Sequence, residues 1–177
     1  MAGEVTDDMT AQDTGCEFCR IAEGSAFARV VDEDRETVAF LPLQPVGDGH
    51  VLVVPRRHVR DLWGLDEATA VALTRSVLRV AHAVRSAFRP AGLNVIHSSG
   101  EAASQTVMHL HVHVVARYEG DRMGSIWPPP LSPEPGRLDV VAERLRTALA
   151  AGATTRSAEQ DSDENGEMGE RQATVEE

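Results

Sequence analysis

The chain of 177 residues suits one domain with tails, and its formal net charge of −11 belongs to the two ends. Residues 14–157 carry no net charge, because the excess of acidic residues lies within 1–13 and 158–177. All 17 basic residues are arginines, which excludes a phosphate-binding lysine, and the pair Arg56-Arg57 is too short to indicate a nucleic-acid partner. No apolar stretch reaches the roughly 20 residues of a membrane span and no signal peptide opens the chain, so we expect a cytoplasmic protein without a membrane partner.

The two ends are polar and poor in aromatic residues. They cannot bury enough apolar surface to offset the entropy of ordering. We therefore expect disordered acidic tails over 1–13 and 151–177, and one folded domain over 14–150.

The first half of this domain is predicted to hold a hairpin, a buried strand and a long helix. Short apolar runs over 29–31 and 36–41 flank an acidic turn, which is typical of a hairpin. After prolines and glycines that break the chain, residues 50–54 form a buried strand. Asp66 is the expected N-cap of a helix that runs to about Phe88, and its apolar residues recur at helical spacing: Leu73, Val77, Val80, Val84 and Phe88.

The second half is predicted to hold two strands and a final helix. A strand over Leu93–Ile96 leads into the small polar loop Ser98–Gln105, which precedes a strand with three histidines. A proline-rich segment at 127–135 separates that strand from a helix over about Leu138–Ala150. Strands and helices in this order indicate an α+β domain.

Histidine alternates with apolar residues in the segment His109-Leu110-His111-Val112-His113-Val114-Val115. Successive side chains of a β-strand point to opposite faces, so the three imidazoles share one face and the apolar residues pack on the other. Imidazole can act near neutral pH as a nucleophile, a proton donor or a metal ligand. Three interpretations stay open on this segment alone: a strand with chance histidines, a metal site built on His-x-His, and histidine-centred group transfer.

Cys16 and Cys19 have the Cys-x-x-Cys spacing of half a zinc site. A redox motif of the thioredoxin type would follow a strand and open a helix, whereas this pair follows a polar tail. His58 and one histidine of the alternating segment are candidates to complete four ligands. Two unliganded thiols are the alternative, and a structural disulfide is not expected in the cytoplasm.

Three segments carry a resemblance to a known family: GHVLVVPRRH from Gly49 to His58, GLN from Gly92, and QTVMHLHVHVV from Gln105 to Val115. In order and spacing they resemble the histidine triad (HIT) family, and the resemblance runs from Cys16 to about Arg117. It implies a HIT-like α+β fold, with an antiparallel sheet of about five strands, a long helix and a C-terminal helix. It also implies a homodimer formed through the long helix and an adjoining strand.

The resemblance implies an enzyme, a hydrolase or nucleotidyl transferase that attacks the α-phosphorus of a nucleotide. His111 would be the nucleophile and would form a nucleotidyl-histidine intermediate, a role that suits neutral imidazole. His113 would contact phosphate oxygens and assist the leaving group, and His50 matches an additional active-site histidine. Candidate substrates are dinucleoside polyphosphates, nucleoside phosphoramidates and aminoacyl-type adenylates.

Three loop residues would bind the phosphate in this resemblance. The backbone N–H groups of Gln105 and Thr106, with the Thr106 hydroxyl, can stabilise charge on phosphoryl oxygens, and simple capping of the loop is the alternative for both residues. Ser98 stands where the family often has Asn or Gln, and Pro42 stands where the family has a residue that binds ribose hydroxyls. These two departures keep open a nucleotide-binding or interaction module with weak or no catalysis.

The zinc-containing bacterial members of the family suggest the remaining ligands. Their pattern maps to four residues of this chain: Cys16, Cys19, His58 and His109. The resemblance thus implies one structural zinc ion per chain and no organic cofactor. A closed four-ligand zinc site has no open position for a substrate, which argues against a metal-dependent hydrolase, the remaining alternative.

Overall fold

The computed structural model describes residues 15–124, 126 and 130–150. The chain divides into two compact units, Met1–Gly124 and Ser125–Glu177, which are described separately. The acidic tails expected over 1–13 and 151–177 lie outside the described residues. Residues 127–129 of the proline-rich segment lie outside them as well.

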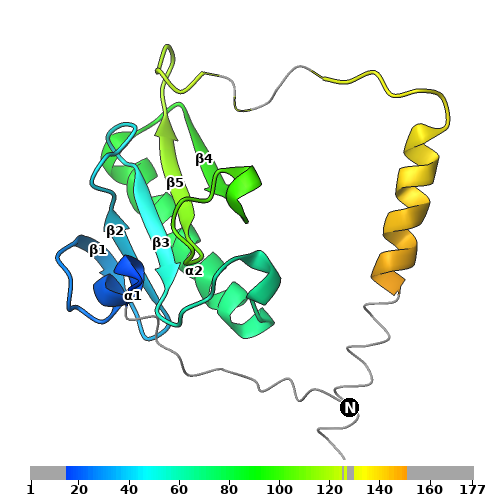
Figure 1. Ribbon diagram of the computed structural model, residues 1–177. Helices are drawn as coiled ribbons and strands as arrows, with labels where there is room; N and C mark the ends of the chain where they lie inside the picture. The colour runs from blue at the N-terminus through cyan, green and yellow to red at the C-terminus, as the bar shows by residue number, and fades with distance from the viewer. Residues whose placement is uncertain (1–14, 125, 127–129, 151–177) are drawn as a thin grey trace, which may run out of the picture. The chain divides into compact units, whose positions relative to one another are not determined.

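Five antiparallel strands form the sheet of the first unit (Figure 1). The hairpin consists of β1 (Arg29–Glu33) and β2 (Thr37–Leu41), followed by β3 (Val51–Pro55), β4 (Gly92–His97) and β5 (Val112–Arg117). The spatial order is β1-β2-β3-β5-β4, and every neighbouring pair is antiparallel. The expected α+β fold with an antiparallel sheet of about five strands is therefore confirmed.

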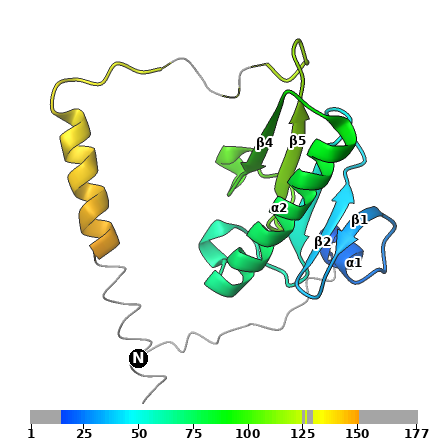
Figure 2. The same cartoon turned by 180° about the vertical axis from the view of Figure 1, so that it is seen from behind.

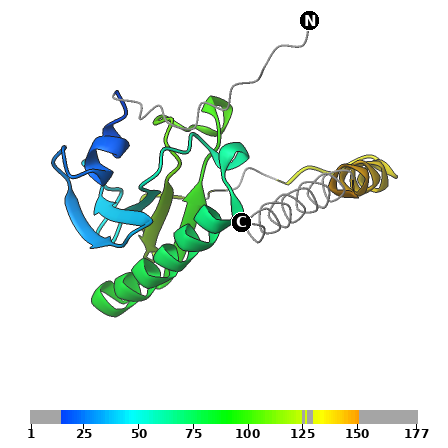
Figure 3. The same ribbon diagram turned by 90° about the horizontal axis from the view of Figure 1, so that it is seen from below.

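Two helices cover opposite faces of this sheet. The long helix α2 (Glu67–Phe88) crosses one face (Figure 2), and the short helix α1 (Glu17–Ala22) lies on the other (Figure 3). The predicted N-cap is confirmed, since the Asp66 carboxylate accepts the Thr69 N–H at 2.8 Å. The helix ends at Arg89, which adopts the left-handed conformation before Pro90.

Side-chain alternation in the central strands divides the core into two clusters. On the α2 side the members include Val53, Leu73, Val80, Val84, Val112 and Val114. On the α1 side they include Phe18, Ile21, Val38, Phe40, Leu52 and Val54. Because His113 is paired with Leu52 in the β3–β5 register, its side chain belongs to the α1 face.

The histidine segment is shorter as a strand than its alternation predicts. The ladder of β5 begins only at Val112, opposite His97, which is the last residue of β4. Leu110 donates its N–H instead to the carbonyl of Val59 at 2.6 Å. His109 therefore lies at the end of a bend and His111 just before the sheet, and Leu110 between them is held by the chain that follows β3.

The second unit contains the predicted C-terminal helix, which spans 137–150 within the described residues. Its apolar residues Leu138, Leu145 and Leu149 are exposed. Among the helices that the structure describes, none combines the length and apolar character that crossing a bilayer requires.

Candidate active site and metal-binding cluster

The first feature of the site is the position of the His111 ring. Its Nδ1 lies 2.7 Å from the backbone oxygen of His109. A carbonyl oxygen can only accept, so Nδ1 carries the proton and Nε2 keeps its lone pair. Burial lowers the pKa of His111 below its usual value, which favours the neutral ring. His111 thus has the form of a nucleophile, with its tautomer fixed by the backbone.

A second pair of rings, His50 and His113, lies beside it. The N–H of Val46 donates to Nδ1 of His50 at 3.1 Å, so a neutral His50 carries its proton on Nε2. That Nε2 lies 2.9 Å from Nδ1 of His113 and donates to it. Neutral His113 therefore carries its own proton on Nε2, away from His50. The backbone N–H of Val46 thus determines, through the His50 ring, which nitrogen of His113 carries the proton.

The two rings face one site with complementary atoms. The ring centroids of His111 and His113 lie 5.1 Å apart. Burial, and next the charges of His111, His50 and His97, lower the pKa of His113 to about 4. With their pKa values lowered, both rings are neutral at pH 7, and one offers a lone pair while the other offers an N–H. This combination suits nucleophilic attack and protonation of a leaving atom.

The polar loop after β4 places its three candidate residues differently. Ser98 is half-buried and directly follows β4, and Thr106 is exposed. Gln105 is buried, and its side chain donates to the carbonyl oxygens of Arg60 at 2.7 Å and Val107 at 3.0 Å.

Gln105 also forms hydrogen bonds through its side-chain oxygen and its backbone N–H. Its side-chain oxygen accepts the Gly100 N–H at 2.7 Å, and its own N–H donates to the Gly100 carbonyl at 3.1 Å. Both kinds of donor on Gln105 are therefore engaged within the protein. The structure gives Gln105 the role of holding the loop, which differs from the phosphate contact that the sequence suggests.

The second feature of the site is a cluster of four potential metal ligands. The ligand atoms of Cys16, Cys19, His58 and His109 all lie within 4.8 Å of one another. The sulfur atoms of Cys16 and Cys19 are each 3.4 Å from Nδ1 of His109, and the sulfur of Cys19 is 3.2 Å from Nδ1 of His58.

These separations fit a tetrahedral zinc ion. Zn–S bonds of about 2.3 Å and Zn–N bonds of about 2.0 Å place neighbouring donors roughly 3.3–3.8 Å apart. His109 donates through Nε2 to the carbonyl of Pro55 at 2.9 Å, which directs the lone pair of Nδ1 at both sulfurs. One lone pair cannot accept two S–H groups, whereas a metal ion uses all four donors. Burial lowers the pKa of His109 to about 4, which keeps the ring neutral, as a ligand must be.

The cluster joins three distant segments and connects with the nucleophile. Cys16 and Cys19 belong to α1 and its N-cap, His58 follows β3, and His109 precedes β5. Phe18, between the two cysteines, packs its ring edge-on against His111 at 5.4 Å between centroids. Sequence reasoning did not identify Phe18, although its place between the cysteines was a usable signal.

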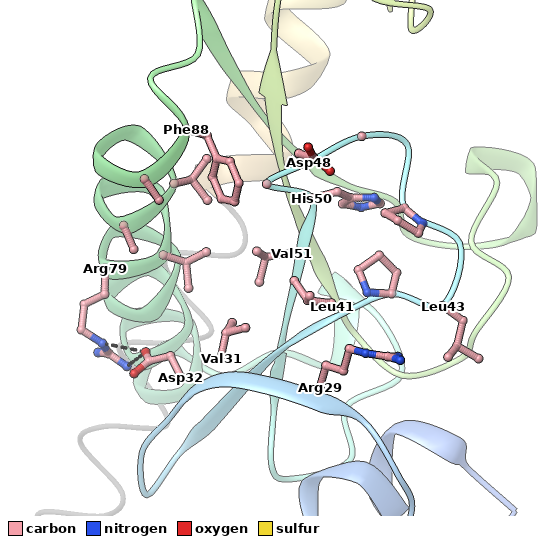
Figure 4. Close-up of a pocket in the computed structure, with 18 residues that line it drawn as sticks. Arg29, Val31, Asp32, Leu41, Leu43, Asp48, His50, Val51, Arg79 and Phe88 are labelled. Atoms are coloured by element: carbon pink, nitrogen blue, oxygen red, sulfur yellow. Dashed lines mark hydrogen bonds and ion pairs between the residues drawn. The ribbon is translucent and has the colours of Figure 1, made fainter.

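A cavity of about 740 Å³ lies elsewhere, between α2 and the hairpin of β1 and β2 (Figure 4). Apolar residues of α2, including Val80 and Phe88, form one wall, and Arg79 pairs there with Asp32. Of the active-site histidines, only His50 lines it. His111 and His113 are on the other face of the sheet and do not line this cavity.

The comparison with known families decides the assignment. The sequence profile of the HIT domain matches residues 23–120, more than half of the chain. The chain belongs to the HIT family. This confirms the family resemblance of the segments around His50, Gly92 and His111.

Individual HIT proteins support the same relation. The Protein hit of Bacillus subtilis is 37% identical over 113 residues, which are 63% of this chain and 78% of that protein. The adenosine 5′-monophosphoramidase hnt1 of Schizosaccharomyces pombe is 31% identical over 121 residues, 67% of this chain and 88% of that protein.

Solved HIT structures also have this fold. A HIT family protein from Bacillus anthracis, 33% identical, covers 76% of this chain and 97% of its own with a TM-score of 0.71. A zinc-bound histidine triad family protein from Mycobacterium smegmatis is 35% identical. The match covers 76% of this chain and 97% of that protein, with a TM-score of 0.59.

Proposed function

We propose that this HIT protein is a hydrolase or nucleotidyl transferase that acts on nucleotides through a covalent intermediate on His111. The observation that carries the proposal is the pair of complementary rings: the Nε2 lone pair of His111 beside a His113 ring that presents its N–H. The name of the yeast relative, an adenosine 5′-monophosphoramidase, supports nucleoside phosphoramidates as a substrate class.

In the proposed first step, Nε2 of His111 forms a bond to the α-phosphorus. The bond from phosphorus to the leaving atom breaks, and its electron pair goes to that atom. A bound phosphoryl anion favours the protonated form of His113, so one proton enters with the substrate on Nδ1 of His113, and the hydrogen bond from Nε2 of His50 to that atom breaks. His113 then gives the proton on Nε2 to the leaving atom.

In the second step, water attacks the phosphorus of the nucleotidyl-histidine. The bond between phosphorus and Nε2 breaks, and its electron pair returns to His111. The proton of the water passes to His113, which restores the pair to its substrate-bound state. The carbonyl of His109 stabilises the positive charge that the ring of His111 carries in the intermediate, because it accepts the Nδ1 proton throughout.

Zinc is proposed at Cys16, Cys19, His58 and His109, with a structural role. The donor separations and the zinc-bound mycobacterial relative support it. Bound there, the ion would cross-link α1 to the segments that flank β3 and β5. Ser98 and Thr106 are proposed to bind the phosphate, because the structure leaves the Thr106 side chain exposed at the end of the loop.

A turnover assay with adenosine 5′-phosphoramidate tests the function. Release of AMP and ammonia is expected from the wild type. It should fall by at least about a thousandfold in His111→Asn, as expected when a nucleophile is removed. The control is His82→Asn, an exposed residue of α2. Near-wild-type turnover by His111→Asn would contradict the proposal.

One observation favours a nucleotide-binding module as a second candidate. Pro42, just after β2, offers no side-chain hydrogen bond at the position where a ribose contact is expected. A module of this kind would bind AMP, show no hydrolysis across dinucleoside polyphosphates and phosphoramidates, and leave no adduct on His111. Isothermal titration with AMP beside the turnover assay separates the two functions.

We also propose a homodimer formed through β4 and α2. β4 is an edge strand of the sheet, and its Val95 is 54% exposed. On α2, Val71 and Leu78 are exposed apolar residues. An unpaired edge beside exposed apolar side chains favours pairing with a second copy. Sedimentation that shows only a monomer at micromolar concentration would contradict it.

A further inference from the structure

His97 is a half-buried histidine that the proposed chemistry does not use. It is the last residue of β4, opposite Val112 in the register with β5. Its Nδ1 lies 2.9 Å from the backbone oxygen of His111, and its Nε2 lies 2.8 Å from the hydroxyl of Ser99. The hydroxyl oxygen of Ser99 also accepts the N–H of Leu62 at 3.0 Å.

These three hydrogen bonds are consistent with a single assignment of donors and acceptors. The carbonyl of His111 can only accept, so Nδ1 of His97 carries the proton. The Nε2 of a neutral His97 then has a lone pair and accepts the Ser99 O–H. The Ser99 oxygen keeps a lone pair for the backbone N–H of Leu62. Every donor in the series has an acceptor, and a single tautomer of His97 satisfies all of them.

The hydrogen bond from His97 to His111 lies at the end of the ladder between β4 and β5. The pairing of β4 with β5 ends at His97 and Val112, so the peptide after His111 lies at the limit of the ladder. On the other side, Leu110 is held by Val59, and the ring of His111 is held by the carbonyl of His109. The His97 contact thus holds the carbonyl of His111 at the point where the ladder between β4 and β5 ends.

We propose that His97 is a positioning residue, which fixes the peptide of His111 and thereby aims its imidazole, with Ser99 and Leu62 holding His97 in the required tautomer. The proposal rests on the nucleophilic role of His111 proposed above. A misplacement of about 1 Å in a reacting group can cost about a hundredfold in rate. His97 is accordingly expected to affect the rate of attack and to leave substrate binding almost unchanged.

The first experiment compares His97→Leu with His97→Asn in the full chain, with adenosine 5′-phosphoramidate as the probe. The Asn side chain can place an N–H near the position of Nδ1, whereas Leu cannot donate. We expect His97→Leu to lower kcat by about 10- to 100-fold with KM within about twofold, and His97→Asn to stay within about threefold of wild type. The exposed His82→Leu is the matched control and should change neither constant.

Equal losses in the Leu and Asn variants would overturn the positioning role, and so would a loss in KM alone. A kcat that stays at the wild-type value in His97→Leu would do the same. If His97→Leu does not fold, Ser99→Ala replaces it, because it removes the hydroxyl that holds the tautomer. A severalfold fall in kcat is then expected, and an unchanged kcat would count against the proposal.

The second experiment needs no turnover. Long-range ¹H–¹⁵N NMR of the imidazoles should show His97 protonated on Nδ1, and a proton on Nε2 instead would overturn the geometry. The ¹⁵N signals of His111 should shift in His97→Leu and stay in place in His97→Asn and His82→Leu. If the wild type fails to hydrolyse the probe, the proposed function is wrong. The NMR signals still show in that case whether His97 positions the ring of His111. Signals of His111 that do not move in His97→Leu would overturn the inference.

Discussion

Replacing Gly49 by alanine should destabilise the fold strongly, because two separate penalties meet at this residue. Gly49 has a φ of +81°, and an L-residue in the left-handed region costs roughly 1–2 kcal/mol. A Cβ would lie 3.1 Å from Cβ of Ala116 and 3.2 Å from atoms of both Phe88 and Val84. Overpacking of this kind costs about 1–3 kcal/mol. The expected loss in the free energy of unfolding is therefore about 2–5 kcal/mol.

Two other glycines separate these penalties. Gly24 has a φ of +77° with nothing within 4 Å of an added Cβ, so Gly24→Ala should show the backbone cost alone, about 1–2 kcal/mol. Gly47 has neither a positive φ nor a close neighbour, so Gly47→Ala should lie within about 0.5 kcal/mol of wild type. Urea unfolding at fixed zinc concentration, followed by circular dichroism, measures all three.

The order of the three variants is the test. A Gly49→Ala protein no less stable than Gly24→Ala would show that the close approach of the loop to α2 is not a constraint. Because His50 follows Gly49 directly and is oriented by Val46 of the same loop, turnover of adenosine 5′-phosphoramidate should fall in the folded Gly49→Ala protein as well.

Three further predictions concern the cluster, the active-site pair and the hairpin. Cys19→Ala, or prolonged dialysis against a chelator, should remove bound zinc and lower the melting temperature, as measured by metal analysis and thermal unfolding; unchanged metal content in Cys19→Ala would contradict the ligand set. His50→Phe should lower kcat by about a hundredfold, since His113 loses the donor that fixes its proton; a rate within threefold of wild type would contradict that role. Burial raises the pKa of Asp34, but the N–H of Glu36, the Arg79 side chain and Thr37 outweigh it and lower the pKa to about 2. Because the folded pKa lies below the unfolded value, Asp34 stabilises the fold above pH 4 and this contribution is lost as the pH falls towards 2. Asp34→Asn should thus cost about 1 kcal/mol at pH 7, after allowance for solvent screening, and only a small part of that at pH 2, as measured in urea titrations; a difference that does not depend on pH would contradict the assignment.

Local sequence signals predicted the long helix and the strands well. Asp66 caps α2 through Thr69, as its position before an apolar periodic stretch indicates. The alternation around Val112 also places its neighbours on the correct faces of the sheet. Alternation did not predict where β5 begins, because the limit depends on a partner: β4 ends at His97, and Leu110 bonds to Val59 instead.

The contacts that fix the proton positions could not be read from the sequence. Val46 acts through its backbone N–H, so no side chain there indicates a role. Gln105 has a polar side chain next to the histidines, but the loop turns it inward, where Arg60 and Val107 accept its hydrogen bonds. His97 resembles an ordinary strand residue until the end of β4 places it against the carbonyl of His111.

Trapping the nucleotidyl-histidine tests most directly whether His111 is the nucleophile. The protein is mixed with adenosine 5′-phosphoramidate, quenched in base within milliseconds to seconds, digested and examined by mass spectrometry. We expect an adenylyl group on the peptide that contains His111. Fragmentation should assign the group to that residue, and it should be missing from His111→Asn. Hydrolysis that proceeds with no adduct at any quench time, or an adduct on another residue, would contradict this role of His111.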